Sequence, residues 1–131
     1  MKYLTDYIKD NQTNALNKAG AFYAFSESQF NEKKVDGVKY VNAGAGLVCP
    51  KDTVEQLLID LKTAYMNGIK RDIEENGLVA IIDRELKNHE CYYTGDIDDC
   101  VDALKSYPVT IDDILQVFNT AKHSPEVLAT L

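Results

Sequence analysis

The sequence predicts an α-rich α+β fold, organised as a single compact domain of about five helices with one short β-hairpin. Three observations support this fold class: a long helical period in the middle of the chain, further amphipathic patterns on both sides of it, and one pair of short strand-like runs. At 131 residues the chain can bury one hydrophobic core but is too short for two independent ones. We therefore expect residues 1–131 to form one domain, with residues 126–131 frayed or docked as a partial turn.

The N-terminal third is expected to contain two helices. The first is an amphipathic pattern over residues 3–19. The apolar run Ala21–Phe25 that follows is too short to be assigned to helix or strand by its period. Ser26 and Gln29 then have the spacing of a capping box, which predicts a short helix over about residues 27–34.

A β-hairpin is expected next. Val38–Val41 alternates as a half-buried strand does, and Leu47–Cys49 is a second short apolar run. The glycines within Asn42–Gly46, between these runs, invite comparison with loops that bind phosphate. A phosphate loop must lead directly into a helix N-terminus, whereas Leu47–Pro50 intervene here, so we do not expect nucleotide binding.

The longest helical pattern lies in the middle of the chain. Its expected buried side chains are Val54, Leu58, Leu61, Tyr65, Ile69 and Ile73, with Leu57 and Ala64 widening the stripe. Pro50 and Asp52 are expected to open this helix, because proline has no N–H and an acid favours the positive end of the helix dipole. Asn76 and Gly77 end it, and a second apolar pattern over Leu78–Leu86 predicts the next helix.

Two further helices are expected in the C-terminal part. Thr94–Asp96 has the composition of a turn, and Asp96 is placed to cap a helix that continues to Leu104. Thr110 with Asp113 predicts the start of a last helix that fades near residues 124–125.

The net charge of −7 is concentrated in one segment. Residues 72–102 contain ten acidic and two basic side chains, whereas the rest of the chain is nearly neutral. An acidic surface repels phosphate backbones, so the expected partner is a protein with a basic surface and not a nucleic acid. The alternative is a solvated face that only aids solubility. The binding residues that we expect are Tyr92, Tyr93, Asp96, Asp98, Asp99 and Asp102.

A metal site or a small enzyme is the alternative function. Glu85 and His89 are spaced i, i+4 on one helix face, and with Asp96 they could hold a metal ion or provide a general base. The competing structural interpretation, which we favour, is that His89 donates to a carboxylate or carbonyl and ties the helix end to the following turn. No cofactor is expected.

The three cysteines are expected to be free thiols. Cys49, Cys91 and Cys100 are odd in number and lack C-x-x-C spacing, which argues against disulfides and against a zinc site with His89. The first residues show no secretory signal, and no apolar run is long enough to span a membrane. We therefore expect a cytoplasmic protein without a membrane partner.

Several short segments of the chain resemble an uncharacterised family of small proteins encoded by tailed bacteriophages and prophages. The segments that carry the resemblance are Ala24–Ser26 with Gln29–Phe30, Gly44–Gly46 with Cys49–Lys51, Ile73–Gly77, Arg84–Leu86 with Asn88–Glu90, and Tyr93–Asp96 with Asp102–Leu104. The resemblance covers about residues 22–104. It implies a phage or prophage origin and a bacterial host cytoplasm, and it brings no known activity or functional residue.

Charge and resemblance together predict a small acidic accessory protein that works by binding. Its partner would be a host or phage protein with a basic surface, and its effect would be to inhibit or modulate a host nucleic-acid or defence factor without catalysis. The sequence leaves the identity of the partner and the oligomeric state open.

Overall fold

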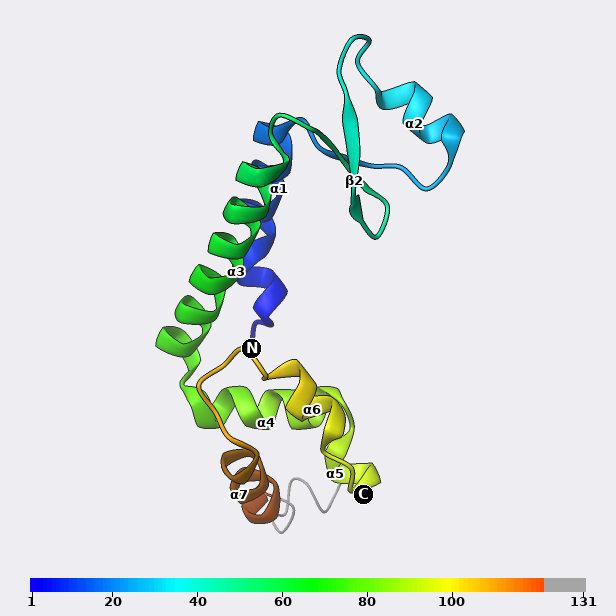
Figure 1. Cartoon of the computed structure of the whole chain (residues 1–131). Helices are drawn as coiled ribbons and strands as arrows, with labels where there is room; N and C mark the ends of the chain where they lie inside the picture. The colour runs from blue at the N-terminus through cyan, green and yellow to red at the C-terminus, as the bar shows by residue number, and fades with distance from the viewer. Residues whose placement is uncertain (122–131) are drawn as a thin grey trace. The chain divides into compact units, whose positions relative to one another are not determined.

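The computed structural model describes residues 1–121, which form seven helices and three strands (Figure 1). This is the α-rich α+β fold class that the sequence predicts. Close contacts divide the chain into two compact units, Met1–Lys70 and Arg71–Leu131. The expectation of one domain over residues 1–131 stays a prediction. The expected fading of the last helix near residues 124–125 and the frayed end at 126–131 lie outside the described residues.

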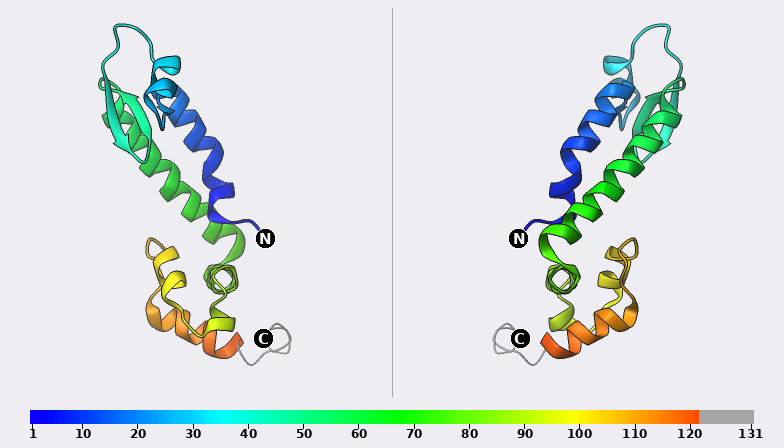
Figure 2. Two further views of the ribbon diagram at one scale, coloured as in Figure 1. Left: turned by 90° about the vertical axis from the view of Figure 1, so that its right-hand side faces the viewer. Right: turned by 90° about the vertical axis from the view of Figure 1, so that its left-hand side faces the viewer.

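Two helices of the first unit lie side by side in both views of Figure 2. Helix α1 (Leu4–Ala19) ends at Gly20, whose φ of 74° is the left-handed conformation that glycine adopts without strain. Helix α3 (Val54–Asn76) lies close to α1 at Gly68, which is buried. A Cβ atom built on Gly68 would lie 2.1 Å from Cγ2 of Ile8, so only a glycine leaves room for α1 at this point.

Replacing Gly68 with alanine tests this close approach. On an exposed helix the change would stabilise by about 1 kcal/mol, because alanine is the better helix former. Here we expect Gly68→Ala to lower the free energy of unfolding by about 1–3 kcal/mol, since Cγ2 is attached directly to the β-carbon of Ile8 and cannot swing away. Urea unfolding followed by circular dichroism measures the change. A stabilised variant would contradict the close packing of the two helices.

The strands β1 (Phe22–Tyr23), β2 (Tyr40–Gly44) and β3 (Leu47–Pro50) form one antiparallel sheet in the order β1-β3-β2. The predicted hairpin is confirmed as β2 and β3, and the unassigned aromatic run supplies the third strand. Of the predicted loop Asn42–Gly46, the first three residues belong to β2, and only residues 45–46 join β2 to β3. The segment therefore does not lead into a helix. The prediction that Pro50 opens the long helix is wrong, because Pro50 pairs with Tyr40 in the sheet and α3 begins only at Val54.

Helix α2 (Glu27–Lys33) begins as its capping box predicts. The Ser26 hydroxyl accepts a hydrogen bond from the backbone N–H of Gln29 at 3.1 Å. The side-chain oxygen of Gln29 accepts one from the N–H of Phe25 at 2.7 Å. The first bond satisfies an N–H group that the first helical turn would otherwise leave unbonded. The second bond ties Phe25, the residue before the N-cap, to the same turn.

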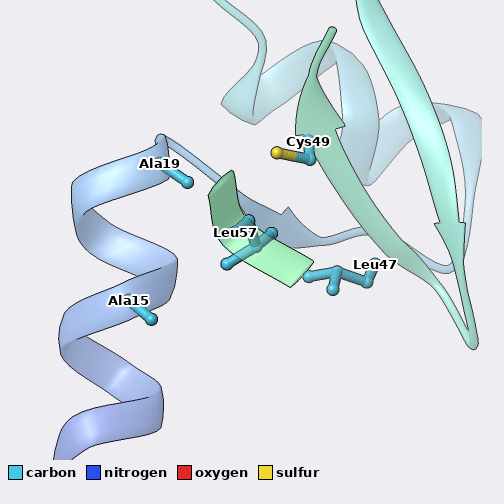
Figure 3. Packing of buried hydrophobic residues seen from close by; sticks show 5 residues of the cluster. All are labelled: Ala15, Ala19, Leu47, Cys49 and Leu57. Atoms are coloured by element: carbon cyan, nitrogen blue, oxygen red, sulfur yellow. The ribbon is translucent and has the colours of Figure 1, made fainter. Parts of the chain in front are cut away.

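The core of the first unit joins α1, α3 and the sheet. Figure 3 shows its five buried residues, whose side chains approach one another from these elements: Ala15, Ala19, Leu47, Cys49 and Leu57. Leu57 is 1% exposed, whereas Leu58 is 52% exposed. The prediction of Leu58 as a buried residue is therefore wrong, since its neighbour Leu57 takes the inward position, and Leu61 packs against the core only partly buried.

The second unit contains the end of α3 and four more helices. These are α4 (Leu78–Asn88), α5 (Cys91–Thr94), α6 (Asp98–Ala103) and α7 (Ile111–Ala121). Helix α4 contacts each of the other three. The predicted start of α7 at Thr110 is confirmed. Thr110 and Asp113 exchange hydrogen bonds of 2.8 and 3.1 Å between side chain and backbone, which form a capping box.

Candidate functional site

A buried polar network connects three parts of the second unit. The guanidinium of Arg84 on α4 donates to both carboxylate oxygens of Asp72 on α3, at 2.9 and 3.0 Å. The same carboxylate accepts from Asn76 at 2.8 Å and from the hydroxyl of Tyr107, which follows α6. Asp72 is 0% and Arg84 6% exposed. Within residues 1–121 every buried side-chain nitrogen and oxygen has a hydrogen-bond partner, so the network is satisfied.

Burial and hydrogen bonding have opposite effects on the pKa values of the charged groups in this network. Burial alone would raise the pKa of Asp72, but the hydrogen bonds from Arg84, Tyr107 and Asn76 together hold this pKa below its usual value. Burial alone would lower the pKa of Arg84, and the Asp72 carboxylate instead raises it above its ordinary value. Both groups therefore stay charged at neutral pH, as an ion pair with bidentate geometry.

Two members of the acidic segment are not on the surface. Asp72 is enclosed, and Glu85 is only 8% exposed, with one carboxylate oxygen 3.1 Å from Nε of Arg84. Neither of the two alternatives, a binding face or a solvated face over residues 72–102, therefore includes these two side chains. A guanidinium with five donors compensates both carboxylates inside the fold.

The structure brings Glu85 and His89 together on α4, as the i, i+4 spacing predicts. Nε2 of His89 lies 3.6 Å from the second carboxylate oxygen of Glu85, so the side chain at the helix end faces a carboxylate. Asp96, the third residue of the metal hypothesis, lies in the loop after α5 and is exposed. In the described part of the chain, no three His, Cys, Asp or Glu side chains are gathered so that they could hold a metal ion.

Cys49, Cys91 and Cys100 are free and fully buried, as the structural interpretation of their spacing predicts. Burial raises the pKa of the Cys91 thiol and raises that of Cys100 to about 12. Thiols with raised pKa values stay protonated at neutral pH, so neither is activated as a nucleophile or as a thiolate ligand.

Of the two adjacent tyrosines predicted to bind a partner, the structure leaves only one accessible. Tyr92 is 8% exposed: its ring stacks on Phe118 of α7 at 5.6 Å, and its hydroxyl donates to Asp83 at 2.8 Å. It is therefore a packing residue between α5 and α7, which corrects its assignment as a binding residue. Tyr93 is 72% exposed.

The four predicted binding carboxylates lie in and before α6. Asp98 and Asp99 form the first turn of this helix, and Asp102 lies in its last turn. Asp96 precedes it, and its side chain accepts a hydrogen bond from the N–H of Asp98 at 2.9 Å. The prediction that Asp96 is the N-cap is wrong, because Ile97 takes that position and the Asp96 bond closes a turn just before the helix. All four residues are exposed. Within residues 1–121 no basic side chain forms an ion pair with any of them.

The buried network is the part of this region that the sequence does not predict. One signal for it exists: Asp72 lies three residues after the buried Ile69, on the inward face of α3. A carboxylate on an apolar stripe needs a buried cation, and Arg84 is one of only two basic residues in the acidic segment. The pairing itself crosses the break at Gly77, so spacing alone does not reveal it.

The chain belongs to the family described as "Family of unknown function (DUF7659)", whose model matches residues 4–124. No curated protein and no solved structure matches the chain. No helix among the described residues is both long enough and apolar enough to cross a membrane.

Proposed function

We propose that this protein is a binding module that captures a partner with a basic surface, without catalysing a reaction. The observation that carries the proposal is the group of four exposed carboxylates at Asp96, Asp98, Asp99 and Asp102, which have no basic partner within residues 1–121. Four like charges within residues 96–102 repel one another, and a basic surface removes that repulsion on binding.

Tyr93 adds an exposed aromatic ring that is close to these carboxylates in sequence. It lies one helical turn before Asp96 in sequence and is 72% exposed, while its neighbour Tyr92 is used for packing. Tyrosine is enriched in protein interfaces, because it offers a large apolar ring together with a polar hydroxyl. We name Tyr93 and the four carboxylates together the acidic face.

The setting of this interaction is also part of the proposal. We place it in the cytoplasm of a bacterial host, for a protein of phage or prophage origin, on the basis of the sequence resemblance. A reducing compartment suits three buried free thiols. A basic groove that binds nucleic acid in a host enzyme or defence factor is the kind of surface that closely spaced carboxylates complement.

Neutralising the four carboxylates tests the proposal. The variant carrying Asp96→Asn, Asp98→Asn, Asp99→Asn and Asp102→Asn keeps the shape of these side chains and removes their charge. We expect it to lose its basic partners in capture from a bacterial lysate, read out by mass spectrometry, because the electrostatic attraction is gone. A circular dichroism spectrum like that of the wild type shows that the variant is folded.

A matched control removes the same charge elsewhere. Asp10→Asn, Glu32→Gln, Asp36→Asn and Asp52→Asn change four exposed acids of the first unit. We expect this control to retain the captured partners. The proposal fails if the acidic-face variant captures the same proteins as the wild type, because these charges would then have no effect on binding. It also fails if both variants lose the captured proteins equally, because only the net charge would then matter.

A further inference from the structure

Helices α4 and α7, which are labelled in Figure 1, line a groove in the second unit. The volume of the groove is about 980 Å³. Both helices and the segment before α7 contribute apolar residues to the lining of the groove. These residues are Leu78, Val79, Ala80, Ile82, Val109, Val117 and Ala121. Ile82 is 2% exposed, whereas Val79 is 69% exposed. The groove thus has a buried floor and an apolar lip that faces solvent.

The charges in the groove are unequal. Asp83 and Lys87 neutralise each other, with Nζ of Lys87 3.0 Å from the Asp83 carboxylate, which also accepts from Tyr92. Asp113 is exposed, and its carboxylate accepts from the backbone N–H of Thr110. In the described part of the chain no basic side chain pairs with Asp113. The groove is therefore apolar with an excess negative charge on the α7 side.

The walls of the groove favour a helix as its occupant. Both helices are 11 residues long, so they border the groove over about 16 Å, or three helical turns. Backbone groups in the middle of a helix are bonded within it, so these walls offer no edge with which an extended strand could pair. An amphipathic helix needs only an apolar surface for its stripe, which this groove provides.

We propose that this groove docks an amphipathic helix of the partner, with an apolar stripe against α4 and α7 and a basic side chain near Asp113. This inference rests on the proposed function, because the groove would supply the same partner with the apolar contact that the acidic face lacks. A second copy of this chain fits less well, since its net charge of −7 would bring acid against acid.

The test uses a synthetic peptide of about three helical turns as the probe. It has Leu at helical i, i+3, i+4 and i+7 spacing and Lys elsewhere, and a second peptide has Glu in place of Lys. Binding to the full chain is followed by fluorescence anisotropy and by amide chemical shifts in NMR spectra. We expect saturable binding of the Leu/Lys peptide, with the largest shift changes in α4 and α7, and much weaker binding of the Leu/Glu peptide.

Val79→Gln locates the site, because it replaces an exposed apolar side chain at the lip with a polar one that a helix tolerates. We expect affinity for the Leu/Lys peptide to fall by about tenfold, as loss of one buried valine contact does. Leu58→Gln, an equivalent change at an exposed position of the first unit, should leave this affinity unchanged.

The outcomes separate the two proposals. Equal binding of the Leu/Lys and Leu/Glu peptides would overturn the basic side chain proposed near Asp113. It would not bear on the acidic face, whose residues do not line the groove and are tested by the variant with four Asp→Asn changes. A preference for the Leu/Lys peptide that Val79→Gln does not weaken, or shift changes that lie outside α4 and α7, would overturn the groove while leaving the proposed function intact. Absence of saturable binding, or a concentration-dependent dimer that Val79→Gln abolishes, would also overturn the groove as a partner site.

Discussion

Replacing Arg84 with methionine is expected to lower the free energy of unfolding by about 3–5 kcal/mol. Methionine fills much of the space of the arginine stem, so the loss is chiefly electrostatic. It leaves the carboxylate of Asp72, which is 0% exposed, without its bidentate partner, and it removes a donor from Glu85. Equilibrium unfolding in urea, followed by circular dichroism, measures the change.

A double variant distinguishes this cause from simple loss of packing. Asp72→Leu combined with Arg84→Met removes both charges at once, and we expect it to recover much of the stability that Arg84→Met loses, because no unpaired charge remains buried. A loss below about 1 kcal/mol for Arg84→Met would show that the ion pair is not buried in solution.

The pH dependence of stability gives an independent check on the same pair. The pKa of Asp72 is depressed in the folded protein, so its stabilising contribution is complete above the unfolded value of about 4 and is lost as pH falls through the folded pKa. In Arg84→Met burial is no longer opposed by the guanidinium, so the Asp72 pKa should rise. The difference in stability between wild type and variant should therefore shrink as pH is lowered from 7 toward 4.

Leu57→Ala is expected to cost about 2–5 kcal/mol, the range for truncating a buried leucine. Leu57 is 1% exposed and belongs to the core that joins α1, α3 and the sheet. The matched control is Leu58→Ala, one residue along the same helix but 52% exposed, for which we expect a change within about 0.5 kcal/mol. Urea unfolding of both variants checks the pair, and similar losses for the two would contradict the orientation of α3.

Features that depend on neighbouring residues could be predicted from the sequence. The pairs Ser26 with Gln29 and Thr110 with Asp113 gave the starts of α2 and α7, because each bond closes within one helical turn. The break at Gly77 was likewise predicted, since glycine there has a φ of 78° that other residues rarely adopt. Local chemistry decides all three.

Features that depend on residues far apart in the chain could not be predicted from the sequence. The strand Phe22–Tyr23 has only two residues and exists because it pairs with Leu47 and Val48, far along the chain. The helical period could not choose between adjacent leucines as the inward residue, because both lie near the edge of a broad apolar stripe.

The candidate site shows the same division. The exposed carboxylates of the acidic face could be predicted from the sequence, because aspartate at a turn or in the first turn of a helix is usually solvated. The number of charges in a segment does not show that Asp72 is buried with Arg84. Nor does the sequence show that Tyr92 packs on Phe118 while Tyr93 stays exposed. The groove between α4 and α7 also depends on how separate helices pack, which no local pattern specifies.

The central claim, that the acidic face binds a basic partner, is tested most directly by the salt dependence of affinity. Isothermal titration calorimetry would measure the binding of a captured and purified partner to the wild type and to the variant with four Asp→Asn changes, at about 0.05 M and about 0.3 M salt. If the acidic face binds the partner, the affinity of the wild type falls as salt is raised. The variant binds more weakly than the wild type at low salt, and the two affinities converge at high salt. Equal affinities for wild type and variant, with no dependence on salt, would contradict this claim.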